Sequence, residues 1–228
     1  MSDRLPEPAT GPGVDGARPD AGRPDAPLPR DWYARPTLEV ARSLLGCLIV
    51  TDLPEGRSVG RIVETEAYLG PRDPASHAWK GRKGRVSIMW DEPGHAYVYR
   101  SYGIHAMLNA VAKAPGEVGG VLIRAVEPVA GIELMRARRG LDDPRGLGSG
   151  PGKLTQALGI TLDEQGTDLT RHGLLWLAPG WSPEAISHGR RIGISRAVEH
   201  PYRYWETGNP CVSAHRKGEP WDGEDALG

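Results

Sequence analysis

Apolar and polar residues alternate along much of this chain, and the alternation predicts short strands joined by tight turns. Residues 37–45 are the first exception, because their apolar side chains recur at the spacing of one helix face. Gly46 suits the position just past the end of that helix. Two β-type runs follow at 47–53 and 57–68, separated by the turn 54–56. We expect these two runs to pair as an antiparallel hairpin.

The rest of the chain predicts more strands with helices at intervals. Residues 70–94 are polar and rich in Gly, Arg and Asp, which predicts a long surface loop. Beyond it the pattern predicts strands at 95–101, 104–113 and 121–126, a helix at 128–140, a Gly/Asp loop at 141–151, a short helix at 152–158 and strand-like pieces at 174–178 and 191–195. These elements indicate one mixed α/β (α+β) domain with a largely antiparallel sheet.

The two ends of the chain differ from the middle in composition. Residues 1–30 are dense in Pro, Gly, Ala, Asp and Arg and hold almost no large apolar side chains. Such a segment cannot bury enough surface to fold, so we expect a disordered tail. The folded domain is expected to occupy residues 31–217, and residues 218–228 are expected to be a frayed C-terminus.

Composition is that of an ordinary globular protein. The 228 residues are 39% hydrophobic and 25% charged, which suffices for one substantial domain. No apolar run is long enough to span a bilayer, and no apolar segment like that of a secretory signal stands at the N-terminus. Cys47 and Cys211 show neither metal-ligand spacing nor a disulfide framework. We therefore expect a cytoplasmic protein with reduced thiols and no membrane partner.

The charge distribution permits nucleic-acid binding without indicating it. The formal net charge is −1 and the isoelectric point is about 6.7, so a uniformly basic surface is excluded. Basic residues cluster in 77–105 and in 186–205. Taken alone, each cluster is better explained as a solvated face.

Two carboxylates occupy alternate positions of the predicted strand 57–68. Glu64, Glu66 and Tyr68 share one face if this strand is regular. Buried carboxylates are costly unless they have a partner or a purpose. Either the face is solvated or neutralised by Arg61 and Arg124, or one of the glutamates performs chemistry.

Three tyrosines crowd the predicted hairpin that follows. Tyr97 and Tyr99 share a face, where they can be core or cross-strand packing. Tyr102 stands at the turn, where small residues are favoured, and an exposed aromatic at such a tip can act as a wedge between DNA bases.

Two polar residues stand inside the next predicted strands. Asn109 marks either a bulge or strand end, or a buried amide whose hydrogen-bond partners a substrate supplies. Arg124 either forms a salt bridge with Glu64 or Glu127, or belongs to a site.

Several common catalytic patterns are missing from the sequence. The histidines and cysteines form no HExxH or paired Cys/His motif, so we expect no metal site. No G-x-S-x-G signature indicates a serine hydrolase. The glycine-rich segment 148–152 lacks the Lys-Ser/Thr end of a phosphate loop, although Lys153 and the adjacent helix start can hold a DNA phosphate.

Read in order, these segments resemble the alkyladenine (3-methyladenine) DNA glycosylases of the mammalian type, a family that also occurs in bacteria. The matching pieces are ARSLLG at 41–46, RIVETEAYLGP at 61–71, His77, PGHAYVY at 93–99, Tyr102-Gly103, Asn109, VLIRAVEP at 121–128, SGPGKL at 149–154, Tyr204 and NPCVS at 209–213. Each motif alone is moderate evidence. Their shared order, from about residue 32 to 214, carries the resemblance.

The resemblance implies a single mixed α/β (α+β) domain with a curved, largely antiparallel sheet, peripheral helices and a protruding β-hairpin. It implies an enzyme that flips a damaged purine out of the duplex and cuts the N-glycosidic bond with water, without metal, cofactor or lyase activity. The expected partner is double-stranded DNA containing alkylated or deaminated purines. A monomer in the bacterial cytoplasm, associated with the nucleoid, is expected.

The resemblance also implies roles around the reacting bond. Glu66 is expected to be the general base that activates water for attack on C1′, and Arg124 is expected to position that water and Glu66. Tyr68, His77 and Tyr99 are expected to line the pocket and stack on the flipped base.

Further implied roles concern the duplex and base selection. Tyr102 is expected to fill the gap that the flipped nucleotide leaves. Asn109 is expected to crowd the exocyclic amine of a normal guanine. Arg82, Arg85 and Lys153 are expected to contact the DNA backbone.

One departure and three rival functions limit the resemblance. In the loop 78–92 the Thr and the Arg-Asn pair that the family usually carries are missing, so its path stays open. The rivals are a damaged-DNA binder without catalysis, an acyl- or formyl-transfer enzyme, and a glycoside hydrolase. The hydrolase would use Glu64 and Glu66 as its carboxylate pair, with Cα atoms about 6–7 Å apart on one strand. The presence of Glu66 favours the enzyme over the binder, and the hydrolase does not explain the tyrosine hairpin or the basic clusters.

Overall fold

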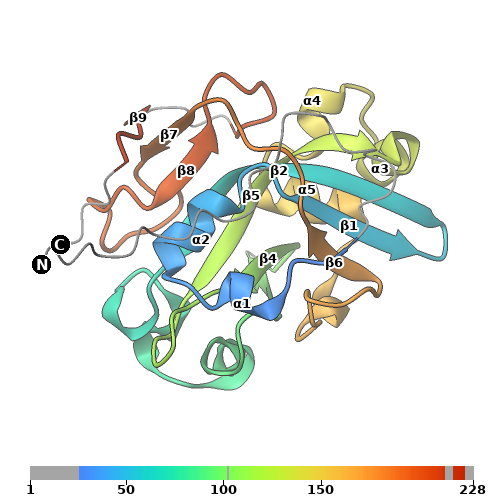
Figure 1. Cartoon of the computed structure of the whole chain (residues 1–228). Coiled ribbons are helices and arrows are strands. Elements are labelled where there is room, and N and C mark those ends of the chain that lie inside the picture. The colour runs from blue at the N-terminus through green and yellow to red at the C-terminus, as the bar shows by residue number, and fades with distance from the viewer. Residues whose placement is uncertain (1–25, 102, 214–217, 224–228) are drawn as a thin grey trace, which may run out of the picture.

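A long central strand, β2 (Gly56–Tyr68), organises the computed structural model, which describes residues 26–101, 103–213 and 218–223 (Figure 1). β2 pairs with β1 (Leu48–Leu53) in the predicted hairpin and also with β5 (Gly120–Ala130) and β8 (Arg203–Glu206). The other strands are β3 (Ala96–Ser101), β4 (His105–Val111), β6 (Leu175–Ala178), β7 (Ile186–Gly189) and β9 (Glu219–Pro220). Every pairing between these strands is antiparallel, so the predicted sheet type is confirmed.

The sheet is open, and helices lie around it. Its strand order is β3-β4-β5-β2-β8-β7-β9, with β1 attached to β2 and β6 attached to β1. The helices are α1 (Arg30–Tyr33), α2 (Thr37–Ser43), α3 (Ile132–Arg139), α4 (Pro144–Leu147) and α5 (Pro151–Leu158). The predicted mixed α/β domain with peripheral helices is therefore confirmed (Figure 1).

β-Bulges bend β2 where it pairs with β5. The register shifts between Ile62 and Glu64 and again between Glu64 and Thr65. Glu66 pairs with Leu122, so an uninterrupted ladder would place Glu64 opposite Arg124, but Glu64 pairs with Ala125. Arg124 is thus an additional residue on its strand. A bulge of this kind twists the strand and redirects a side chain, which matters for the site below.

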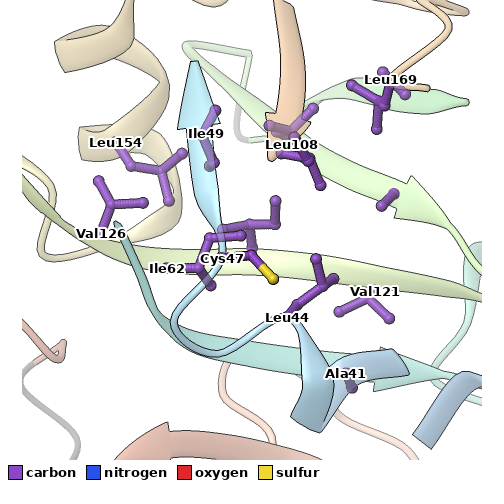
Figure 2. Close-up of a cluster of buried hydrophobic side chains, with 14 of the residues drawn as sticks. Ala41, Leu44, Cys47, Ile49, Ile62, Leu108, Val121, Val126, Leu154 and Leu169 are labelled. Carbon is purple, nitrogen blue, oxygen red and sulfur yellow. The ribbon is translucent and has the colours of Figure 1, made fainter. Parts of the chain in front are cut away.

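The hydrophobic core lies between the sheet and helices α2 and α5. Figure 2 shows core side chains that belong to α2, to the neighbouring strands and to α5. α5 has a buried face that includes Leu154, Ala157 and Leu158, and it ends at Gly159, whose φ of 72° is a left-handed helix cap. The predicted helices at 37–45 and 152–158 correspond to α2 and α5.

Four predicted elements differ from the structure. The expected loop 70–94 contains the short 3₁₀ helices η1 (Gly70–Arg72), η2 (His77–Lys80) and η3 (Gly84–Trp90), which have no periodicity long enough to detect. A further 3₁₀ helix, η4 (Leu162–Glu164), follows α5. The helix expected at 128–140 begins only at Ile132, because β5 continues through Pro128 at a register shift, where a strand tolerates proline.

The third difference concerns the strand-like piece expected at 191–195. No residue of that segment belongs to a strand, and the nearest strand, β7, lies earlier at Ile186–Gly189. The expected loop 141–151 likewise contains α4 and the start of α5. Alternation of apolar residues alone does not distinguish a strand from an irregular segment. In this segment backbone groups form hydrogen bonds with side chains, such as that of the Ile192 N–H with Glu66.

The packed structure extends past both predicted domain boundaries. Leu28 is buried, and its backbone N–H donates to the Leu177 carbonyl at 2.8 Å, so the expected tail of residues 1–30 overlaps the fold at 26–30. At the other end, β9 pairs with β7, and the Trp221 N–H donates to the Ile186 carbonyl at 2.9 Å. The boundaries expected at residues 31 and 217 therefore move outward.

Two kinds of feature are absent from the described ranges. None of the helices there combines the length and the apolar character needed to cross a bilayer. Over the same ranges, His, Cys, Asp and Glu side chains do not gather in threes that could hold a metal ion.

Candidate active site

A cavity of about 920 Å³ opens at the end of β2. Six of the predicted site residues line it, although the sequence separates the first from the last by more than fifty positions: Tyr68, His77, Arg85, Tyr99, Asn109 and Arg124. The remaining walls come from the η2–η3 region, from Pro151 at the start of α5 and from the irregular segment 192–196. The fold thus brings the expected pocket residues together around one space.

Glu66 lies directly behind this wall. Its side chain is completely buried, and it is not among the residues that line the cavity. The Tyr68 hydroxyl donates to its Oε2 at 2.9 Å. The Ile192 backbone N–H donates to its Oε1 at 2.7 Å, and Arg124 Nη1 lies 3.3 Å from the same oxygen. All three partners of Glu66 line the cavity, so the carboxylate is one residue away from it.

Burial and hydrogen bonds act on the Glu66 carboxyl in opposite directions. Burial raises its pKa, whereas the Arg124 charge, the Ile192 N–H and the Tyr68 hydroxyl lower it, and the net pKa is raised. Burial also raises the pKa of Tyr68 well above its ordinary value, so this hydroxyl stays protonated and can donate. Burial lowers the pKa of Arg124, but Glu66 and Glu64 outweigh it and raise the net pKa. The site therefore holds a cation beside a carboxylate with increased proton affinity.

Glu64 is equally buried but is enclosed by protein groups. Its Oε1 accepts from Arg124 Nε and Arg203 Nη1, both at 3.1 Å, and from Ser213 Oγ at 2.9 Å. Its Oε2 accepts from the Ser213 backbone N–H at 2.8 Å. The salt bridge foreseen between Arg124 and Glu64 is thus present. Arg61 does not take part in neutralising Glu64 or Glu66, because it pairs with Glu127 and Glu206.

Aromatic side chains form one wall of the cavity. The rings of Tyr97 and Tyr99 stack with centroids 5.4 Å apart, and His77 meets Tyr99 edge to face at 4.5 Å. His77 Nδ1 lies 2.9 Å from the Tyr97 hydroxyl, and burial lowers the pKa of His77, which favours the neutral ring. Tyr97 is 5% exposed and packs on Ala78, so its expected packing role is confirmed, although it also lines the cavity.

Asn109 stands in the interior of β4 and not at a strand end or a bulge. It pairs in register with Tyr97 on β3 and with Leu122 on β5. Its Nδ2 donates to the Tyr97 carbonyl at 3.1 Å and to the Met107 carbonyl at 3.4 Å. The backbone thereby sets the orientation of this amide at the cavity wall.

The tip of the β3–β4 hairpin presents an apolar side chain to solvent. Tyr102, the expected wedge, lies outside the described residues. The following Gly103 has a φ of 73°, a conformation that glycine adopts without strain, and Ile104 is 76% exposed. The described part of the tip is therefore a turn with an outward apolar residue.

Several cationic side chains line the cavity: Lys80, Lys83, Arg85, Arg124 and Arg196. Within the described part of the chain, no Asp or Glu is among the lining residues. The other expected backbone contacts lie away from it. Arg82 pairs with Asp91 at 2.6 Å on the exposed surface, and Lys153 is exposed in the first turn of α5. Cationic side chains are therefore gathered along the cavity.

Several residues of the site were not foreseen from the sequence. Ile192 acts through its backbone N–H, which no side-chain pattern reveals. Arg203 and Ser213 reach Glu64 from the far end of the chain. Ser213 lies in the NPCVS motif of the resemblance, and that motif was the one available signal. Arg191, which precedes Ile192, forms a buried ion pair with Asp73.

The geometry weakens the rival function of a paired-carboxylate glycoside hydrolase. That reaction needs two carboxyl groups flanking the bond to be cut. The Glu64 carboxylate is fully buried among Arg124, Arg203 and Ser213, and it does not line the cavity. Glu64 is therefore bound by other protein groups and is not placed to act as the second carboxylate of such a pair.

The comparisons with known proteins agree with one another. A family model described as Methylpurine-DNA glycosylase (MPG) matches residues 31–210. The chain is 49% identical over 191 residues to a protein of Methanoculleus marisnigri, which covers 82% of this chain and 98% of the relative. It is 47% identical over 196 residues to one of Chlorobaculum tepidum (85% and 93% covered) and 46% identical over 191 residues to one of Bacillus subtilis (82% and 96% covered). All three relatives carry the name "Putative 3-methyladenine DNA glycosylase".

Proposed function

The chain belongs to the methylpurine-DNA glycosylase family, and we propose that it removes alkylated and deaminated purines from duplex DNA by hydrolysing the N-glycosidic bond. The family makes it a DNA glycosylase for alkylated bases. The observation that carries the finer proposal is the carboxylate of Glu66, held behind the wall of a cavity that aromatic and cationic side chains line.

Glu66 is the proposed general base. A water oxygen attacks C1′ of the sugar, the C1′–N bond breaks, and its electron pair leaves with the base. Glu66 accepts the proton that the attacking water loses. A raised pKa makes a carboxylate a better base near neutral pH, and the Arg124 charge favours its ionised form. Arg124 is proposed to orient the water as well, since it lines the cavity and contacts the carboxylate.

Water must pass the cavity wall to reach Glu66, because this side chain has no exposed surface. The Tyr68 hydroxyl occupies Oε2, and the Ile192 N–H and Arg124 occupy Oε1. We propose that the attacking water binds Oε2 beside the Tyr68 hydroxyl, because that hydroxyl uses only one of the two acceptor positions of this oxygen. Hydrogen bonds of this kind commonly rearrange when substrate enters.

The aromatic wall suits a flipped purine. A base inside the duplex must leave the stack before C1′ can be reached, at a cost of roughly a few kcal/mol. Stacking of a base on an aromatic side chain stabilises the complex by about 1–3 kcal/mol and tolerates different bases. Tyr68, His77 and Tyr99 are proposed to supply it, and their ring faces attract cationic alkylated purines in particular.

Three more roles are proposed for residues around the pocket. Asn109, whose amide nitrogen is tied to two backbone carbonyls, would crowd the exocyclic amine of guanine. Tyr102 would fill the gap in the duplex. Arg82, Arg85 and Lys153 would hold phosphates, an electrostatic role that the acid-free cavity lining supports for Arg85.

One observation favours a second candidate function, a damaged-DNA binder without catalysis. Glu66 does not line the cavity, and both of its oxygens have protein partners. Binding and catalysis are separable, because a binder would retain the lesion duplex without releasing a base.

The test is a base-release assay on duplex oligonucleotides that each carry one lesion: hypoxanthine, 3-methyladenine, 7-methylguanine or ethenoadenine. The proposal predicts free base and an abasic strand that needs a separate treatment to break. Retention of the duplex without release would establish the binder. Spontaneous strand cleavage at the abasic site would contradict the assignment as a hydrolase without lyase activity.

A further inference from the structure

Arg191 ties together two segments that approach the cavity from different parts of the chain. Its side chain is completely buried and pairs with both oxygens of Asp73, whose side chain is 2% exposed. Arg191 Nη1 also donates to the Ala67 carbonyl at 2.9 Å, next to Tyr68 on β2. Asp73 in turn accepts the backbone N–H groups of Leu69 at 3.2 Å and Ala75 at 3.0 Å. The pair therefore links the end of β2 and the η1 turn to the segment after β7.

The same guanidinium lies next to both neutral donors on Glu66. It stands 4.8 Å from the centroid of the Tyr68 ring, whose hydroxyl donates to Oε2 of Glu66. The next residue along the chain is Ile192, whose N–H donates to Oε1. The buried Arg191–Asp73 pair thus adjoins two donors to Glu66. The Tyr68 hydroxyl donates to one carboxylate oxygen and the Ile192 N–H donates to the other.

We propose that the Arg191–Asp73 pair is a positioning device that fixes the Ile192 N–H and the Tyr68 hydroxyl on Glu66. The inference rests on the proposed role of Glu66 as the base. Neither Arg191 nor Asp73 lines the cavity, so neither is expected to touch substrate.

The irregular backbone of this segment makes such an anchor necessary. Residues 190–202 form no strand or helix, so no ladder of hydrogen bonds sets the position of Ile192. Ala197 has a φ of 47°, which a residue with a Cβ rarely adopts, and its carbonyl lies 3.4 Å from Arg191 Nη2. Contacts with other elements hold this segment: the Arg190 carbonyl accepts from Arg203 Nε at 3.0 Å and the Tyr202 carbonyl accepts from the Ala67 N–H at 2.8 Å. The bidentate pair at Arg191 directly precedes Ile192, whose N–H contacts Glu66.

Loss of the anchor changes the proton affinity of Glu66 in a predictable direction. The charged and titratable groups facing Glu66 are Arg124 from β5, Glu64 and Tyr68 from β2, and Arg203 from β8. The two neutral donors stabilise the ionised form of Glu66. If they loosen while these charges stay in place, the base is protonated at a higher pH. Activity then declines sooner as the pH falls.

The test uses Arg191→Lys, which keeps the positive charge but cannot form the planar bidentate pair. Arg138→Lys is the matched control, because Arg138 also ties segments together, through Glu55 Oε1 at 2.9 Å and the Ala157 carbonyl at 2.9 Å, and does not line the cavity. Single-turnover base release from an alkylated-purine duplex is measured across pH, with Glu66→Gln as the blank. For R191K we expect the acid limb to move to higher pH and the rate on that limb to fall about tenfold, with R138K following wild type.

The outcomes separate the inference from the function on which it rests. If wild type releases no base, the proposed function fails. If wild type is active and E66Q is not, but R191K and R138K have the same pH profile, the positioning role is overturned. If R191K does not fold, Asp73→Asn replaces it with the same expectation. Unfolding of both variants beside a folded R138K also overturns the proposal, because the pair would then serve the fold as a whole.

Discussion

Glu64 and Glu66 stand two residues apart on β2, are both fully buried and share Arg124, yet their surroundings differ in kind. Glu64 is enclosed by Arg124, by Arg203 on β8 and by Ser213 near the end of the described chain. Every partner of Glu66 also lines the cavity. Glu64 is thus enclosed by protein groups, whereas Glu66 lies directly behind the cavity wall.

The difference shows how a fold gives two identical residues different surroundings. Neither residue type nor exposure distinguishes the two acids, since both have no exposed surface. What distinguishes them is the identity of their neighbours and whether those neighbours reach the cavity. Arg124 is the additional residue at the register shift beside Glu64, and it contacts both carboxylates.

The largest effect on this comparison is expected from Glu64→Gln. It leaves Arg203 and Arg124 with a neutral partner in a buried site, and breaking a buried ion pair costs about 3–5 kcal/mol of unfolding free energy. Denaturant unfolding measures it. Glu55→Gln, which removes the exposed partner of Arg138, is the control and should leave the unfolding midpoint near that of wild type. Equal midpoints for the two variants would refute the structural role of Glu64.

The proposed role of Glu66 requires that a base from the duplex enters the cavity. The next largest effect tests this requirement through binding of a lesion duplex. Tyr102→Ala is expected to weaken binding to a lesion duplex by about 1–3 kcal/mol, the worth of one aromatic stacking interaction. Tyr97→Ala serves as the comparison, because Tyr97 is buried in the hairpin and is not at its tip. Equilibrium binding to labelled duplex measures both. If the two variants weaken binding equally, Tyr102 is not the wedge.

A smaller effect is expected from Arg85→Ala at the cavity. Removing one cation that binds a DNA phosphate lowers the slope of log K against log salt by about 1. Arg72→Ala is the matched control, because Arg72 is exposed, pairs with Glu117 and does not line the cavity. Titrations of undamaged duplex at several salt concentrations give the slope. An unchanged slope for R85A would remove Arg85 from the DNA interface.

The smallest effect concerns the dependence of stability on pH. The folded-state pKa of Glu66 is raised by burial, so between its unfolded and folded pKa values the folded state binds more protons than the unfolded state. The ionised carboxylate therefore costs stability, and this cost grows as the pH rises through that window. Glu66→Gln removes the ionisable group, so its stability relative to wild type should increase with pH across the window. A difference that is flat with pH would contradict the burial effect.

Much of the fold could be predicted from the sequence, because it depends on periodic patterns. The hairpin of β1 and β2, the helices α2 and α5, and the antiparallel sheet all follow from apolar spacing and turn residues. The 3₁₀ helices between Gly70 and Trp90 could not be predicted, because single turns leave no period. The β5 extension past Pro128 was missed because proline indicates a strand end unless a bulge accommodates it.

The site was predictable where side chains carry the signal. Glu66, Tyr68, Tyr99, Asn109 and Arg124 all gather at one cavity or directly behind it, as the shared order of motifs indicated. The choice between Glu64 and Glu66 did not follow from alternation along a strand. It depends on three things that the pattern does not show: a bulge, a backbone N–H at Ile192, and an arginine from β8.

The most direct test of the central claim compares wild type with Glu66→Gln in single-turnover base release, with each protein's unfolding free energy measured beside it. Loss of a general base lowers the rate about 10²- to 10⁴-fold. We predict a loss of that size in E66Q, without loss of stability and with lesion-duplex binding retained. Release by E66Q within about threefold of wild type, well below the loss expected for a general base, would contradict the account.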